Sequence, residues 1–286
     1  MIPAAFDYAR PASIDEALEL LAAGDPSIRV LAGGQSIVPL MKLRLARPER
    51  LVDVGRLPEL RGIRGAEDGG LVIGALTTWA TLLADARVTS IGALADVLPQ
   101  IGDVQVRNLG TIGGSLVHAD PASDIAAPAL ALDVRLVARS AARGERTIPI
   151  AELFAGAFMT TLEPDELLTE IHIPRLAPGG ASAYVALPQQ ASGYPIAGVA
   201  VVLGARTGGD GPPASIGIGV TGVGDQPYRA TAVEEAILAG AVPADAVSTI
   251  SAGQHVATDI HADREYRGAM AVVMARRALE ACSARI

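Results

Sequence analysis

The sequence contains few of the residues that build metal centres and covalent cross-links. Its one cysteine, Cys282, excludes an intramolecular disulfide and a zinc or iron–sulfur site made from cysteines of this chain. We interpret Cys282 as a small apolar residue of the last helix rather than a redox thiol. The four histidines form no H-E-x-x-H motif or spaced His/Asp cluster that would indicate a metal. Aromatic residues amount to 3%, so aliphatic side chains must fill the core.

Positive charge is also scarce. The formal net charge is −8, and the dispersed arginines form no basic face of the kind that nucleic acid requires. No apolar run reaches the roughly 18 residues of a membrane span. Residues 1–11 lack the apolar segment of a secretion signal. We therefore expect a cytoplasmic protein with no nucleic-acid partner and no membrane span.

The order of predicted elements divides the 286 residues into three units. Residues 1–55 are predicted to form a strand–helix–strand unit after an initial strand and helix, with elements at 28–32, 37–45 and 51–54. Residues 56–175 are predicted to mix strands and helices, with elements at 71–75, 77–83, 91–108, 124–131, 134–138 and 168–173. A linker rich in proline and glycine, 174–180, ends this unit.

The third unit, residues 180–286, has a different pattern. Strands are predicted at 184–187, 196–204 and 215–220, and helices follow at 231–239, 243–256 and 263–283. A run of strands followed by a run of helices is typical of a separate α+β domain.

The first candidate site is a glycine segment between a strand and a helix. This first glycine segment, Ala32–Ser36 (AGGQS), is followed by a helix expected to begin at Ile37. Glycines allow the backbone to approach a ligand closely, and the free N–H groups of a helix start suit a phosphate or pyrophosphate. Taken alone, the segment fits an ordinary tight turn equally well.

A second glycine segment, Gly110–Ser115 (GTIGGS), has the same character. It is expected to be a loop, and His118–Asp124 (HADPASD) follows it closely. Carboxylates suit the hydroxyls of a ribose or ribityl chain, whereas His118 is interpreted as a loop residue that orients its neighbours. Two such segments on adjacent units could hold the two ends of one pyrophosphate, so the pair is stronger evidence than either alone.

A third glycine pattern misleads. Gly217–Gly222 (GIGVTG) matches the dinucleotide pattern G-x-G-x-x-G, but no helix is predicted to open after it. Its glycines alternate with Ile and Val, which favours a close-packed strand.

The two glycine segments and their flanks resemble the FAD-binding medium subunit of the molybdenum hydroxylases, the family of aerobic carbon monoxide dehydrogenase and bacterial xanthine dehydrogenase. The resemblance extends to 39–44 and 222–230, and it covers essentially the whole chain. It implies an α+β protein with a PCMH/VAO-type FAD-binding fold, in which two αβ subdomains (1–55 and 56–175) bind FAD and a C-terminal α+β domain (180–286) covers the flavin.

The same resemblance implies a set of FAD-binding residues and no catalytic side chain or metal ligand. The two glycine segments would contact the pyrophosphate and ribityl regions, Asp124 a sugar hydroxyl, and Ile101 and Leu168 the pocket near the adenine or flavin. Tyr194 could cover the flavin ring. The full set is Ala32, Gly33, Gly34, Gln35, Ser36, Ile37, Ile101, Thr111, Gly113, Gly114, Ser115, Asp124, Leu168 and Tyr194.

The implied function is electron transfer within a larger oxidoreductase. A molybdopterin-binding large subunit would hydroxylate the substrate, and [2Fe–2S] clusters of a small subunit would pass electrons to this FAD, within a dimer of heterotrimers. Quinone, NAD or dioxygen would be the terminal acceptor. The alternatives are a stand-alone FAD-dependent oxidase of the VAO/PCMH type and a scaffold subunit, which the intact glycines oppose. The chain has Gln35 and Ala186 where many members have His and Lys, which bears on the choice of acceptor.

Overall fold

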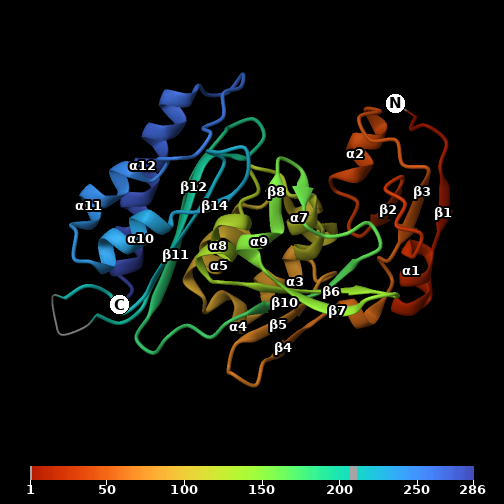
Figure 1. Cartoon of the computed structure of the whole chain (residues 1–286), viewed down its shortest axis with the longest axis horizontal. Helices are drawn as coiled ribbons and strands as arrows, with labels where there is room; N and C mark the ends of the chain where they lie inside the picture. Colours follow the sequence, from red (N-terminus) through yellow and green to blue (C-terminus); the bar gives the residue numbers. More distant parts are fainter. Residues whose placement is uncertain (1, 207–210) are drawn as a thin grey trace.

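The strands and helices form three parts that follow one another across the molecule (Figure 1). A computed structural model describes residues 2–206 and 211–286 of the chain. The amino-terminal part lies at one end, a larger central part carries a five-stranded sheet, and the carboxy-terminal sheet and helices lie at the other end. The expected α+β architecture of two αβ subdomains and a C-terminal α+β domain is confirmed.

The first part is a small parallel sheet with two helices. The strand order is β1-β3-β2, and the elements are β1 (Asp7–Ala9), α1 (Ile14–Leu21), β2 (Ile28–Leu31), α2 (Ile37–Lys42) and β3 (Arg50–Asp53). Helix α1 begins where the Ser13 hydroxyl accepts a hydrogen bond from the Glu16 N–H at 3.1 Å. Its apolar face, including Leu18 and Leu21, is buried with Val52 of β3. This packing fixes the sheet whose carboxyl edge carries the first glycine segment.

The central part is an antiparallel sheet in the order β4-β5-β10-β6-β7. Its strands are β4 (Ile63–Gly65), β5 (Leu71–Gly74), β6 (Arg135–Ser140), β7 (Gly144–Pro149) and β10 (Leu167–Ile173), with a small ribbon of β8 (Phe154–Gly156) and β9 (Met159–Thr160). Its helices are η1 (Pro58–Leu60), α3 (Trp79–Ala84), α4 (Ala86–Thr89), α5 (Gly92–Val97), η2 (Leu98–Gln100), α6 (Val104–Leu109), α7 (Ile112–His118), α8 (Ala126–Ala131) and α9 (Ile150–Leu153).

The single helix expected over 91–108 was wrong. The chain forms α5 and the 3₁₀ turn η2, bends at Gly102, where φ is +53°, and starts again as α6. Proline inside η2 and a glycine in the left-handed region interrupt the backbone ladder. Asp103 then caps the new helix by accepting from the N–H groups of Gln105 and Val106, both at 2.8 Å. The pattern of apolar residues continued through this bend, but the hydrogen bonds did not.

The third part is an antiparallel sheet in the order β11-β12-β13-β14. It contains β11 (Ala181–Pro188), β12 (Pro195–Leu203), β13 (Ile216–Thr221), β14 (Tyr228–Arg229), α10 (Thr231–Leu238), α11 (Pro243–Ala246), η3 (Val247–Thr249) and α12 (Arg264–Ser283). The helix expected over 243–256 is therefore limited to α11 and η3, and turns follow, with Gly253 at φ +76°. Among the described residues, no helix combines the length and apolar character that a bilayer crossing needs.

Helices cover both faces of this third sheet (Figure 1). Helices α10 and α12 pack on one face, and α5 and α8 of the central part pack on the other. Close approach of α8 explains the misleading glycine pattern, because a Cβ added to Gly217 or Gly219 would lie closer than 3.0 Å to a carbonyl oxygen of Ala131 or Ala127. The prediction of a close-packed strand is confirmed. The third part thus packs against α8, which follows α7 and the loop of residues 119–124.

Candidate functional site

The first glycine segment presents a row of unused backbone donors. It leaves β2 after Leu31 and bends at Gly34, where φ is +74°. Within the described part of the chain, the N–H groups of the five residues from Gly33 to Ile37 have no acceptor, and Ser36 does not cap α2 with its side chain. Gln35 folds back, and its Nε2 donates to Gly33 O at 3.2 Å. Consecutive free N–H groups at a helix start form a site for an anion.

The second glycine segment is not a loop, which corrects the expectation from sequence. Thr111 is the N-cap of α7, and Gly113, Gly114 and Ser115 lie in its first turn. The Gly113 N–H donates to Ala75 O at 3.0 Å, and the Gly114 N–H donates to the Thr111 hydroxyl at 3.2 Å. The Ser115 N–H donates to Thr111 O at 3.1 Å. Because these donors are occupied, the segment offers small residues and hydroxyls rather than free amides.

The two glycine segments meet face to face. A Cβ added to Gly33 would lie closer than 3.0 Å to Leu109 O, and one added to Gly114 would lie 3.7 Å from the Ala32 Cβ. A cleft of about 220 Å³ opens between them, lined by Ala32, Gly33, Gly55, Arg61, Leu76, Thr78, Asn108, Leu109 and Thr111. The structure therefore brings three of the residues predicted from sequence to one cavity. They are Ala32 and Gly33 of the first segment and Thr111 of the second.

Arg61 supplies positive charge at this cleft. It directly follows η1, and its Nη2 donates to Gly55 O at 2.5 Å, which holds the guanidinium at the cleft wall. Arginine can bind a phosphate through two parallel hydrogen bonds. Sequence reasoning missed this residue because a lone arginine after a short turn belongs to no motif.

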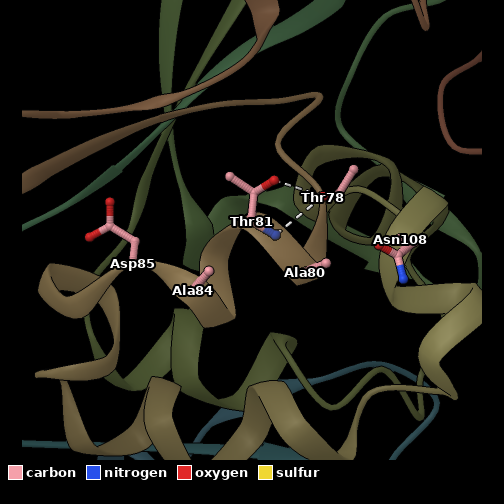
Figure 2. Close-up of a pocket in the computed structure, with 6 residues that line it drawn as sticks. All are labelled: Thr78, Ala80, Thr81, Ala84, Asp85 and Asn108. Atoms are coloured by element: carbon pink, nitrogen blue, oxygen red, sulfur yellow. Dashed lines mark hydrogen bonds between the residues drawn. The ribbon is translucent and has the colours of Figure 1, made fainter.

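A second groove adjoins the cleft and shares Thr78 and Asn108 with it (Figure 2). Thr78 caps α3, and its hydroxyl lies 2.9 Å from that of Thr81. The far end contains Asp85, whose pKa the Arg87 side chain lowers to about 2, so this carboxylate is ionised. The Arg87 guanidinium pairs with this carboxylate at 2.6 Å, so the groove carries no net charge there. Because Arg61 gives the inner cleft a positive charge, an anion is favoured in the cleft.

Asp124 lies in the loop of residues 119–124, here called the aspartate loop, between α7 and α8. Its Oδ1 accepts a hydrogen bond from the Tyr184 hydroxyl at 2.6 Å, although the two residues are 60 positions apart. Burial raises the pKa of Asp124 to about 7, the Tyr184 hydrogen bond lowers it in part, and Asp120 raises it. The carboxyl group can therefore exchange a proton near neutral pH.

Tyr194 precedes β12 and is 47% exposed. Burial raises the pKa of its phenol, and Asp120 and Asp124 raise it further, which places the ring in the neighbourhood of the aspartate loop. His118 ends α7 on the same side, with its ring centroid 5.2 Å from that of Phe158. Burial lowers the pKa of His118. An exposed aromatic ring is thus available near the carboxyl group that was predicted to contact a sugar.

Two other predicted residues do not line the cleft. Ile101 packs partly buried, and Leu168 packs buried, against the apolar core of the central part. Ala186, at the position where many family members have lysine, also packs partly buried against this core. The described residues contain no group of three or more His, Cys, Asp and Glu placed to hold a metal ion. The cleft, with the free Gly33 N–H, two glycines in its wall and Arg61, fits a cofactor with a pyrophosphate.

Comparisons with known proteins find matches over nearly the whole chain. Residues 4–176 match the family model "FAD binding domain in molybdopterin dehydrogenase", and residues 182–282 match the "CO dehydrogenase flavoprotein C-terminal domain". The carbon monoxide dehydrogenase medium chain of Hydrogenophaga pseudoflava is 38% identical, over 100% of this chain and 99% of its own. The glyceraldehyde dehydrogenase medium chain of Sulfolobus acidocaldarius is 35% identical, over 94% of this chain and 92% of its own.

A solved structure supports the same conclusion. A chain of reconstituted CO dehydrogenase from Oligotropha carboxidovorans superposes with a TM-score of 0.94 at 37% identity, and 100% of each chain is covered. Two family models and full-length relatives above 30% identity therefore identify the family. The chain belongs to the family of FAD-binding medium subunits of the molybdenum hydroxylases, which includes those of carbon monoxide dehydrogenase and xanthine dehydrogenase.

Proposed function

We propose that FAD binds with its pyrophosphate on the first glycine segment and one of its sugar-chain hydroxyls on Asp124. The row of free N–H groups from Gly33 to Ile37, which begins at Gly33 in the wall of the cleft that Thr111 also lines, carries this proposal. Arg61 adds a positive charge at the same wall. The second glycine segment closes the opposite side, and Ile101, Leu168 and Tyr194 complete the set of residues proposed near the adenine and flavin.

In the proposed role, this chain is the electron-transfer subunit of a hydroxylase complex. FAD supplies the capacity to accept electrons from [2Fe–2S] clusters of a small subunit and to pass them to a terminal acceptor. A molybdopterin-binding large subunit would bind the substrate, in a dimer of heterotrimers. Two observations support the division of labour. The relatives are medium chains of dehydrogenases named for unlike substrates, and the one cysteine of this chain is buried. Substrate choice then depends on a different subunit.

The test uses the purified, FAD-loaded chain under anaerobic conditions. The chains that co-purify with it from its native source identify the complex, and the substrate is the compound that this complex oxidises. We expect the isolated chain to keep its oxidised flavin absorbance when that substrate is added, and dithionite to reduce the same sample as a control. Addition of the partner subunits should restore reduction by the substrate. Rapid flavin reduction by the isolated chain alone would instead establish a stand-alone oxidase.

A further inference from the structure

The aspartate loop is held in place by the third part of the protein. The Thr221 hydroxyl, at the end of β13, lies 3.0 Å from Pro121 O and 2.9 Å from Ser123 O. The neighbouring Gly222 N–H donates to Pro121 O at 2.8 Å. These hydrogen bonds cross from the C-terminal sheet to a loop of the central part. The loop that carries Asp124 therefore takes its shape from residues about 100 positions further along the chain.

Among the described residues, Tyr184 provides the one side-chain hydrogen bond to the Asp124 carboxyl group. Its ring is 2% exposed, and its backbone N–H donates to Asp96 Oδ2 at 3.0 Å. Gly198, paired nearby on β12, leaves the space that the phenol occupies, because an added Cβ there would lie closer than 3.0 Å to the Tyr184 hydroxyl. The buried phenol thus packs against Gly198, and its hydroxyl donates to Asp124 Oδ1.

We infer that Tyr184 is a positioning residue for FAD, which orients the Asp124 carboxylate and holds it ready to accept from a sugar-chain hydroxyl. This inference rests on the proposed contact between Asp124 and FAD. It makes the C-terminal sheet a contributor to cofactor affinity through a residue that does not itself touch the cofactor.

The charges around Asp124 give this role a distinctive pH dependence. Tyr184 stabilises the ionised carboxylate by donating to it, whereas burial and Asp120 favour the protonated form. Asp124 in turn raises the pKa of the Tyr194 phenol. Asp120 raises the pKa of His118 against the larger, opposite effect of burial. Removal of the Tyr184 hydroxyl should raise the pKa of Asp124 further, so that at neutral pH the carboxyl group is mostly protonated and accepts hydrogen bonds poorly. Affinity lost in this way returns when the pH is high enough to ionise Asp124.

The chain contains a matched control. Tyr228 of β14 is also buried, and its hydroxyl has no hydrogen-bond partner among the described residues. Tyr184→Phe and Tyr228→Phe therefore delete the same atom from two buried rings of one sheet, and only the first deletion removes a hydrogen bond to Asp124.

The experiment measures the FAD dissociation constant of the full-length, FAD-depleted chain by titration at pH 7 and pH 9. We expect Tyr184→Phe to weaken binding about tenfold at pH 7, the typical effect of losing a hydrogen bond to a charged group, and markedly less at pH 9. Tyr228→Phe should bind like wild type at both. Gly198→Ala, which would displace the Tyr184 hydroxyl and also press on the Thr221 side chain, is a second variant and should show the same pH dependence if Tyr184→Phe does not fold.

Asp124→Asn separates this inference from the proposed function. In its background, Tyr184→Phe should cause little additional loss, because the carboxylate through which it acts is gone. Additive losses, or equal losses in the two tyrosine variants, would overturn the positioning role. If Asp124→Asn itself binds FAD like wild type, the role and the Asp124 contact both fail. FAD binding by the first glycine segment would still stand, because a variant of that segment, Gly34→Ala, tests it separately.

Discussion

Replacement of Asp124 by asparagine should stabilise the FAD-free chain, and more so as the pH rises. Asp124 is a carboxyl group held in a partly buried site whose pKa is raised from 3.8 to about 7. Its ionisation is therefore costly in the folded state. Asparagine remains neutral and still offers an oxygen to the Tyr184 hydroxyl. A residue kept for cofactor binding thus lowers the stability of the empty protein.

The sign and size follow from proton linkage. Below pH 3.8, Asp124 is protonated in both folded and unfolded chains, and its ionisation costs the fold nothing. Between pH 3.8 and about 7 the unfolded chain loses the proton while the folded chain retains it, so stability falls through this window. The full cost above pH 7 is at most about 4 kcal/mol, since water at the partly exposed carboxylate reduces it. Between pH 5 and pH 8.5, the advantage of Asp124→Asn should grow by up to about 2.5 kcal/mol.

Urea unfolding of the FAD-free chain can measure this difference. Trp79 is the only tryptophan and is 2% exposed, so its fluorescence reports unfolding of the central part. Comparison of wild type with Asp124→Asn at each pH cancels the other titrating groups, and Asp245→Asn, which neutralises an exposed carboxylate on α11, serves as the control. A stability gain that stays constant from pH 5 to pH 8.5, or a loss that grows with pH, would refute the reasoning.

Three further variants test the cleft and its surroundings. Gly34→Ala should lower the flavin-to-protein absorbance ratio of the purified chain, because alanine strains a backbone at φ +74°. The control is Gly144→Ala, which has the same backbone strain at φ +72° but lies in open space away from the cleft. This control should remain fully loaded with FAD. Arg61→Gln should weaken FAD binding about threefold to tenfold and make it less sensitive to salt, whereas Arg64→Gln on the exposed side of β4 should not. Gly219→Ala should cost about 1–3 kcal/mol in urea unfolding by pushing α8 off the sheet, and an unchanged stability would contradict the packing explanation.

Local patterns in the sequence determined much of the architecture. The Ser13 cap, the glycine pair after the second strand and the change to strands after residue 180 each involve residues close together in the chain. The same holds for the rejection of the dinucleotide pattern, because Gly217 and Gly219 alternate with buried apolar residues. Such patterns succeed because hydrogen bonds of helices and turns join residues only a few positions apart. They failed at 91–108, where the apolar period continued while the backbone turned at Gly102.

The site itself was decided by tertiary structure. No local pattern shows that the amides of the first glycine segment are free while those of the second are occupied by Ala75 and Thr111. Likewise, Arg61 reaches the cleft and Tyr184 reaches Asp124 only because β-sheets and α8 bring distant segments together. A side chain's hydrogen-bond partners and its burial depend on how the whole chain packs, and these determine its pKa and its role. The sequence therefore determined which residues were available to hold FAD, and the fold decided which of them could act together.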